Sequence, residues 1–275
     1  LNDDGWRWAL AVGLVPAAYA LVVRFGMPES VRFLESKGRY DEAEAIVREY
    51  EESAGRATTA PDSQVSPPDS GEPTAPTDTG RRVSIWAPNL RARTGALWIV
   101  WFGINLSYYG AFIWLPSLLV AQGFDLVTSF GYTLIITLAQ LPGYAVAAWL
   151  IEVWGRRATL ATFLAGSAVA AALFGLAETP GTVIAAGMAL SFFNLGAWGA
   201  LYAIGPELYP TPVRGSGTGS AAAFGRLASI VAPLLVPLLL DSGGNALVFG
   251  VFAASFVVAA CAAITLPEKA GTVLE

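Results

Sequence analysis

The feature that most constrains this chain is a series of seven apolar runs, each about twenty residues long. As helices, runs of this length cross the ~30 Å hydrocarbon core of a bilayer. The runs cover residues 8–25, 97–120, 130–151, 158–177, 182–204, 218–240 and 245–266. A soluble core does not supply seven such runs separated by short polar turns, and only 13% of the residues are charged, against about 25% in soluble domains. The sequence therefore predicts an all-α, multi-pass membrane protein.

Basic residues gather on one side of the predicted membrane. Of the 16 Lys and Arg residues, all but Arg7 and Arg226 lie in or directly beside one set of loops. These loops are residues 26–96, 152–157, 205–217 and 267–275. Loops rich in Lys and Arg stay in the cytoplasm, whereas the turns on the other side carry acids but no Lys or Arg. We therefore expect a plasma-membrane protein whose large loop and C-terminus are cytoplasmic.

The amino-acid composition excludes several kinds of function. The chain has no histidine and a single cysteine, Cys261, within an apolar run. Zinc sites, disulfides and histidine-based catalysis are therefore excluded. We predict no catalytic residues, no metal site and no nucleic-acid partner, and hence no enzyme; the lipid bilayer is the expected surrounding.

A long polar segment separates the first apolar run from the other six. We divide the chain into a first membrane helix (1–26), charged helices (27–52), a linker rich in Pro, Ser and Thr (53–82), a basic flank (83–96), a six-helix bundle (97–266) and a tail (267–275). The linker has almost nothing to bury, so it is expected to be disordered. The flank is either an amphipathic stretch at the cytoplasmic membrane surface or a solvated basic segment. This layout is that of the second half of a twelve-span transporter.

Three charged motifs lie on the predicted cytoplasmic side. They are Pro28-Glu29-Ser30-Val31-Arg32-Phe33-Leu34, Glu152-Val153-Trp154-Gly155-Arg156-Arg157 and Pro206-Glu207-Leu208-Tyr209-Pro210-Thr211-Pro212-Val213-Arg214. In this order, they resemble motifs of sugar-porter-type transporters of the major facilitator superfamily. One position departs from the family pattern, because Ala148 stands where the second motif has a leading glycine. The resemblance therefore gives weaker support for close packing of helices at residue 148.

Motifs inside the spans resemble a narrower branch, the metabolite:proton symporters related to bacterial niacin permeases and animal organic-ion transporters. They are Tyr108-Tyr109-Gly110 with Trp114-Leu115-Pro116, and the stretches 138–144, 196–199 and 223–226. The resemblance implies a major facilitator fold, present as its C-terminal six-helix bundle plus the sixth span. It also implies coupling to protons without a bound cofactor, and the N-terminal half of the same transporter as a partner.

The charged motifs contain candidate gating residues. Glu152 could pair with Arg156 or Arg157 across the cytoplasmic mouth, and Glu207 could pair with Arg214. Pairs that form in one conformation and break in another would bias inward-facing against outward-facing states. The alternative is that these charges only follow the rule for membrane orientation.

Arg226 is the candidate centre of a binding site. It lies twelve residues past Arg214, at most about 18 Å along a helix, which is about midway through the membrane. A cation inside an apolar span is costly, so it indicates a functional site. No Asp or Glu lies within any of the seven runs away from its ends, so either an acid of the missing half or the substrate must neutralise it.

Polar and aromatic residues recur at spacings of three or four in the other spans and predict a cavity-lining face. The series are Trp101, Asn105, Tyr108, Tyr109 and Phe112; Thr133, Thr137, Gln140 and Tyr144; Ser191, Asn194, Trp198 and Tyr202; and Arg226, Ser229 and Pro233. From these we select as substrate-binding residues Arg226, Asn105, Tyr108, Tyr109, Gln140, Asn194 and Trp198. The alternative is that they link helices to one another or lie at the membrane interface.

The resemblance also suggests the substrate class. Related organic-ion transporters carry an acid at the position of Arg226 for cations and an arginine for anions, which implies a carboxylate here. Guanidinium pairs with carboxylate through two hydrogen bonds, and the aromatic residues suggest an aromatic or heteroaromatic acid such as nicotinate. Two alternatives remain: a transporter of sugars, polyols or cations, and a non-transporting sensor or scaffold on the same fold.

Overall fold

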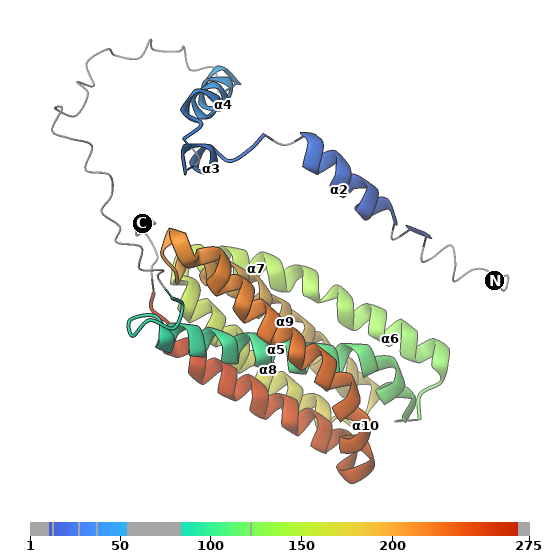
Figure 1. Cartoon of the computed structure of the whole chain (residues 1–275). Helices are drawn as coiled ribbons and strands as arrows, with labels where there is room; N and C mark the ends of the chain where they lie inside the picture. Colours follow the sequence, from blue (N-terminus) through green and yellow to red (C-terminus); the bar gives the residue numbers. More distant parts are fainter. Residues whose placement is uncertain are drawn as a thin grey trace. The chain divides into compact units, whose positions relative to one another are not determined.

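The computed structural model describes residues 11–12, 14–26, 28–36, 38–53, 84–121 and 123–268. The chain divides into two compact units, Leu1–Thr79 and Gly80–Glu275, and each is described by itself (Figure 1). Residues 1–10 and 13 of the predicted first membrane helix lie outside the described residues, as do most of the predicted linker and most of the predicted tail.

The first unit contains three described helices, α2 (Leu14–Gly26), α3 (Val31–Ser36) and α4 (Tyr40–Ser53). The chain turns between α3 and α4 at Gly38, whose φ is 72°. Leu34 and Ala43 are buried where these two helices pack. Arg39 donates from Nε to the Glu42 carboxylate at 2.7 Å, and this contact lowers the pKa of Glu42.

The second unit is a bundle of long helices. They are α5 (Arg91–Ala121), α6 (Leu126–Leu138), α7 (Gln140–Trp154), α8 (Arg156–Gly175), α9 (Pro180–Glu207) and α10 (Thr211–Ile264). Five helical segments of the described chain are long and apolar enough to cross a membrane. Because α6 and α7 count there as one segment and α10 contains two segments of sufficient length, the described bundle has six segments long enough to cross a membrane.

The longest helix, α10, is two spans joined by a tight turn. As a continuous helix its 54 residues would be roughly 80 Å long, more than twice the membrane core. The helix breaks at Gly243 and Gly244, whose dihedral angles are non-helical, and Gly244 has a φ of 63°. Both halves bond to α5, the first through Ser229 and the second through the Phe252 carbonyl, and the orange and red halves meet at this turn in Figure 1.

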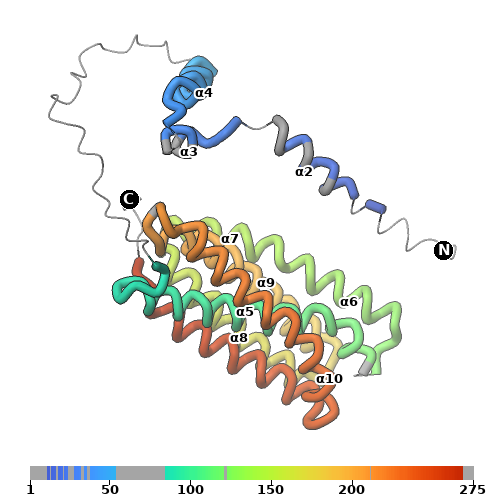
Figure 2. The backbone as a smooth tube through the Cα atoms, in the orientation of Figure 1, coloured from blue at the N-terminus to red at the C-terminus, as the bar shows by residue number. Residues whose placement is uncertain are grey.

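The apolar run expected over residues 130–151 is a span with an internal interruption. α6 ends at Leu138 and α7 begins at Gln140, with Ala139 between them in a turn. Pro142 has no backbone N–H to donate to Leu138, which accounts for the interruption. The two helices still follow one line, as the green tube in Figure 2 shows.

The surface of the bundle is rich in large apolar side chains. Val127, Leu234 and Trp149 are exposed by 81%, 69% and 64%. Inside, phenylalanines and small residues pack tightly; a Cβ on Gly143 of α7 would lie only 2.3 Å from the Phe192 carbonyl oxygen of α9. An apolar exterior around a close-packed interior is typical of helices that face lipid on one side and each other on the other.

Candidate functional site

Arg226 lies within the first half of α10 and is exposed at the surface of the described bundle. Its Nη1 donates to the Tyr109 hydroxyl of α5 at 2.6 Å, and its guanidinium carbon lies 5.9 Å from the Tyr109 ring centroid. The neighbouring Gly225 allows this approach, because a Cβ there would lie 2.8 Å from the Asn105 amide nitrogen. The charge is therefore held where α10 crosses α5.

A cavity of about 270 Å³ lies beside Arg226, between α5, α9 and α10. It is lined by Trp101, Leu201, Tyr202, Gly205, Pro206, Thr218, Gly219, Ala222 and Arg226. The small residues leave the space, two aromatic rings form one wall, and Arg226 is the one charged group among these lining residues. Such a cavity suits a small ligand that has an apolar ring and an anionic group.

Aromatic rings connect Arg226 to α9. The Tyr109 ring lies 5.4 Å from that of Tyr108, which lies 6.0 Å from Trp198. Trp198 stacks on Tyr202 at 5.6 Å and meets Trp101 edge to face at 5.5 Å. The structure thus brings together four of the predicted binding residues, Arg226, Tyr109, Tyr108 and Trp198.

Trp101 and Tyr202, which line the cavity, are absent from the selected set of binding residues. Each lies four residues from a selected residue, Asn105 and Trp198 respectively, on the same helical face. That spacing was the signal that could have placed them in the set.

The two predicted asparagines occupy different environments. Asn105 is fully buried; its Nδ2 donates to the Trp101 carbonyl at 2.7 Å, and its Oδ1 accepts from Ser229 of α10 at 2.9 Å. It therefore links α5 to α10. This agrees with the alternative interpretation of the sequence, in which such residues join helices to one another. Asn194 of α9 is just as buried, yet neither of its amide atoms has a hydrogen-bond partner among the described residues.

Gln140, the remaining predicted binding residue, begins α7. It is partly buried and interacts with the Tyr108 hydroxyl. It therefore lies at the edge of the same aromatic group.

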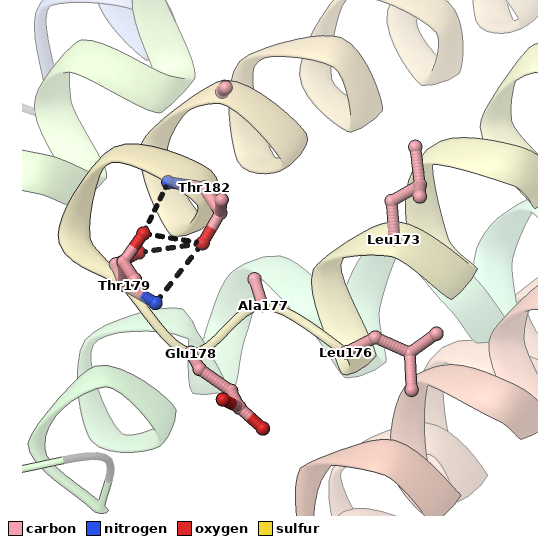
Figure 3. Close-up of a pocket in the computed structure, with 7 residues that line it drawn as sticks. Leu173, Leu176, Ala177, Glu178, Thr179 and Thr182 are labelled. Carbon is pink, nitrogen blue, oxygen red and sulfur yellow. Dashed lines mark hydrogen bonds between the residues drawn. The ribbon is translucent and has the colours of Figure 1, made fainter.

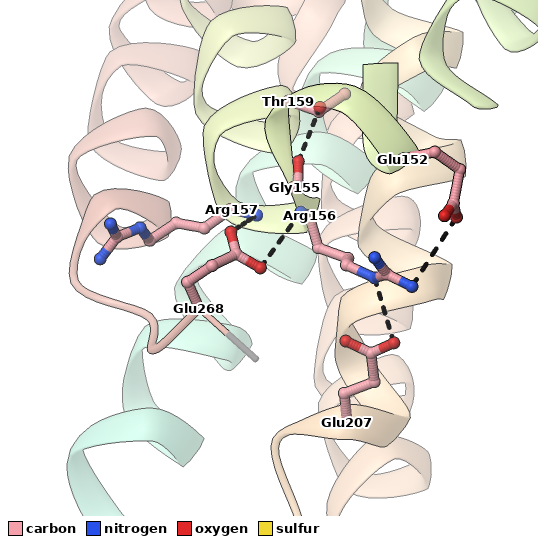
Figure 4. Close-up of polar contacts among 7 residues, drawn as sticks. All are labelled: Glu152, Gly155, Arg156, Arg157, Thr159, Glu207 and Glu268. Atoms are coloured by element: carbon pink, nitrogen blue, oxygen red, sulfur yellow. Dashed lines mark hydrogen bonds and ion pairs between the residues drawn. The ribbon is translucent and has the colours of Figure 1, made fainter. Parts of the chain in front are cut away.

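Four of the five candidate gating residues lie where α7, α8 and α9 end or begin: Glu152, Arg156, Arg157 and Glu207 (Figure 4). Gly155, with a φ of 89°, turns the chain from α7 into α8. Arg156 pairs with Glu152 at 3.8 Å, and its Nε donates to Glu207 of α9 at 3.2 Å. The side chains of Arg156 and Glu207 are only 21% and 19% exposed, so this pair is more shielded from water than a surface ion pair.

The structure differs from the pairing that we expected for Glu207. Glu207 contacts Arg156 rather than Arg214, and Arg214 donates to the Tyr209 carbonyl at 3.4 Å. The Tyr209 hydroxyl in turn donates to Thr94 at 3.1 Å, and burial raises the pKa of Tyr209. Sequence order suggested the nearer arginine, whereas the bundle brings the start of α8 to the end of α9.

Glu268, which sequence reasoning missed, binds the start of α8 from beyond the end of α10. Its carboxylate accepts from the backbone N–H groups of Arg156 at 3.3 Å and Arg157 at 2.9 Å. The side chain of Arg157 donates to the Leu266 carbonyl at 3.4 Å. A carboxylate at a helix N-terminus satisfies free N–H groups and the helix dipole. The sequence signal that could have identified Glu268 is an acidic residue directly after the last predicted span.

A larger cavity, of about 480 Å³, lies at the other end of α8, beside the turn into α9 (Figure 3). Its polar hydroxyls, those of Thr179 and Thr182, bond to each other and cap α9. The remaining lining is mostly alanine and leucine, with Glu178 exposed at the rim. Because its hydroxyls serve the helix cap, this cavity is a weaker candidate for a binding site than the space beside Arg226.

A family profile described as "Sugar (and other) transporter" matches residues 1–275. The chain belongs to this family. Within the sugar transporter family, the chain is 43% identical over 266 residues to the niacin transporter NiaP of Acinetobacter baylyi, covering 96% of this chain and 59% of that protein. It is 39% identical over 273 residues to a putative niacin/nicotinamide transporter NiaP of Bacillus subtilis, covering 98% and 60%. The chain thus spans about three-fifths of the length of these relatives.

The fold of this sugar transporter family member is that of the major facilitator superfamily. It matches the proton:xylose symporter XylE, solved with 6-bromo-6-deoxy-D-glucose, with a TM-score of 0.74 at 20% identity. The match covers all of this chain and 58% of XylE. The predicted family and the all-α major facilitator fold are therefore confirmed, and the relatives are named as transporters rather than as enzymes.

Proposed function

We propose that the full-length protein is a proton-coupled transporter of a small organic anion, an aromatic or heteroaromatic carboxylate such as nicotinate. The observation that carries this proposal is the environment of Arg226. Its guanidinium borders a cavity and donates to the Tyr109 hydroxyl, and no carboxylate of the described residues forms an ion pair with it. A carboxylate substrate would neutralise it through the paired hydrogen bonds that arginine forms with such groups.

The relatives support this choice of substrate. Two proteins at 43% and 39% identity are named as transporters of niacin or of niacin and nicotinamide. The aromatic wall of Trp101 and Tyr202 offers stacking to the ring of such a molecule. In this proposal the protein lies in the plasma membrane, with its large loop and C-terminus in the cytoplasm.

We further propose that the contacts of Arg156 with Glu152 and Glu207 bias the transporter toward one conformation. Alternating access opens and closes the two ends of a central site. A shielded ion pair across the ends of α8 and α9 stabilises one of these states, and a bound ligand shifts the balance between them.

The substitution Arg226→Ala in the full-length protein tests the substrate proposal. We expect saturable uptake of labelled nicotinate to be lost, because the anion then has no counter-charge in the cavity. Arg226→Lys should retain part of the uptake, since a lysine supplies charge without the paired geometry.

The matched control is Arg91→Ala, at the exposed start of α5, which should leave uptake unchanged. Membrane levels of all variants are measured by quantitative blotting. Normal uptake by Arg226→Ala would exclude Arg226 as the anion-binding group.

A sugar is the second candidate substrate, because the family profile and the xylose symporter favour it. Competition separates the two: nicotinate and benzoate should reduce uptake of labelled nicotinate, whereas glucose and a quaternary amine should not. Uptake of labelled glucose that acids do not inhibit would favour the sugar instead.

A further inference from the structure

One face of α9 holds an unusual group of buried polar atoms. Ser191, Asn194 and Trp198 are spaced by three and four residues, so they lie on one side of the helix. They are exposed by 0%, 1% and 7%. Among the described residues, Ser191 Oγ, both amide atoms of Asn194 and Trp198 Nε1 are buried without a hydrogen-bond partner. Buried polar groups in proteins are almost always paired, so a group of unpaired ones requires an explanation.

Asn105 shows that this bundle can satisfy a buried amide when it serves only the fold. It is as buried as Asn194, yet its amide bonds to the Trp101 carbonyl and the Ser229 hydroxyl. The hydroxyl of Ser167, also fully buried, bonds to the Phe163 carbonyl of its own helix. The unpaired atoms on α9 therefore differ from Asn105 and Ser167. Among the described residues, Trp98, Trp114, Glu207 and Asn245 also have one unpaired buried atom each, whereas the α9 group has four such atoms on one helical face.

The α9 group is linked to the cavity beside Arg226 through Tyr202, although none of its three residues lines that cavity. The ring of Trp198 stacks on Tyr202, which lines that cavity, and meets Tyr108, the ring next to Arg226's partner Tyr109. On the same face of α9, one turn before Ser191, a Cβ on Gly187 would lie 2.6 Å from the Ile136 side chain of α6. The polar group is therefore closed by packing at one end and continuous with the aromatic wall at the other.

The chemistry of the three side chains determines what they can bind. Trp198 offers a donor, and Ser191 and Asn194 each offer a donor and an acceptor. None of them is charged, so a second ionised group would be buried there without compensation, which is costly. A neutral heteroatom, such as a pyridine nitrogen or the two ends of a carboxamide, suits these groups.

We infer that Ser191, Asn194 and Trp198 form a neutral polar subsite on α9 that recognises the ring heteroatom of a substrate whose carboxylate binds Arg226. This inference rests on the proposed function and adds to it the substrate class, a heteroaromatic rather than a carbocyclic acid. A site built to hydrogen-bond a substrate group discriminates strongly against an analogue that lacks it, because its own polar atoms then stay unpaired.

The test compares inhibition of labelled nicotinate uptake by unlabelled nicotinate and by benzoate, which lacks the ring nitrogen, in the full-length transporter. Wild-type protein should prefer nicotinate at least tenfold. Asn194→Leu, which keeps the volume without the amide, should reduce that preference about tenfold. Trp198→Phe, which keeps a ring without the N–H, should reduce it several-fold and serves if Asn194→Leu does not reach the membrane.

The control separates this inference from the proposed function. Ser167→Ala, which removes a fully buried hydroxyl that bonds within its own helix, should leave the nicotinate-to-benzoate ratio unchanged. A wild-type ratio in Trp198→Phe and in every Asn194→Leu sample that retains uptake would overturn the subsite. Retained uptake in Arg226→Ala would instead overturn the anion site, and a wild-type protein that carries neither acid would overturn both.

Discussion

Gly155 joins α7 to α8 in a backbone conformation that other residues avoid. Its φ of 89° lies in the left-handed region, which glycine adopts without steric cost. A Cβ at this position would also lie 2.8 Å from Glu268 Oε2, the oxygen that accepts from the backbone of Arg157. One glycine therefore sets both the turn between two spans and the space for a carboxylate from the far end of the chain.

We expect Gly155→Ala to lower the stability of the folded protein by about 1–3 kcal/mol, because φ of 89° with ψ of 169° is a conformation that is essentially limited to glycine. The measurement is the thermal unfolding temperature of the purified full-length protein in detergent. Gly215→Ala is the matched control, because Gly215 lies inside α10 with nothing within 4 Å of its added Cβ. That variant should be as stable as wild type or slightly more so, and equal stability of both variants would contradict the role given to Gly155.

Single residues also show where prediction from sequence reaches its limit. Asn105 and Asn194 have the same chemistry and lie on comparable faces of apolar helices, so their sequence contexts do not separate a structural link from an unpaired amide. Asn105 bonds to the Trp101 carbonyl of its own helix and to Ser229 of another helix, whereas Asn194 has neither kind of partner among the described residues. Spacing along one helix predicted the face that carries Tyr108, Tyr109 and Trp198, whereas hydrogen-bond partners depend on packing between helices.

At the scale of helices, the N-terminus of α8 depends on a residue beyond α10. Glu268 accepts from the first two N–H groups of α8, which have no partners within the helix. We expect Glu268→Gln to weaken this contact by about 0.3–1 kcal/mol, because the amide keeps one acceptor oxygen and loses the charge that the helix dipole favours.

The measurement is again the unfolding temperature, with Glu178→Gln as the control, since Glu178 is an exposed acid beside the other end of α8. A larger decrease for Glu178→Gln than for Glu268→Gln would contradict this assignment.

The apolar runs predicted which segments are long enough to cross a membrane better than they predicted where each helix begins and ends. The run expected from residue 97 belongs to a helix that already begins at Arg91, because hydropathy detects the membrane core and not the turns outside it. The interruption at Ala139 was not predicted. A proline in an apolar run can bend a helix, break it or fit into it, and the outcome depends on the neighbouring residues.

At the scale of the whole molecule, the orientation of the bundle can be tested with cysteine labels. Ser242 lies beside the turn of α10, and Ser216 lies near the start of that helix; both side chains are exposed. In a full-length protein without other cysteines, Cys261 replaced by serine, we expect Ser242→Cys to react with a membrane-impermeant maleimide on intact cells. Ser216→Cys should react only after permeabilisation, because its loop is expected to be cytoplasmic. The reverse pattern would invert the proposed orientation.

The turn at Gly243 and Gly244 makes the two halves of α10 a helical hairpin. One arm carries Arg226, and the other ends at Ile264, shortly before Leu266 and Glu268, which hold the start of α8. Because the joint is only two residues long, Arg226 and the residues that anchor the start of α8 belong to one covalently continuous hairpin.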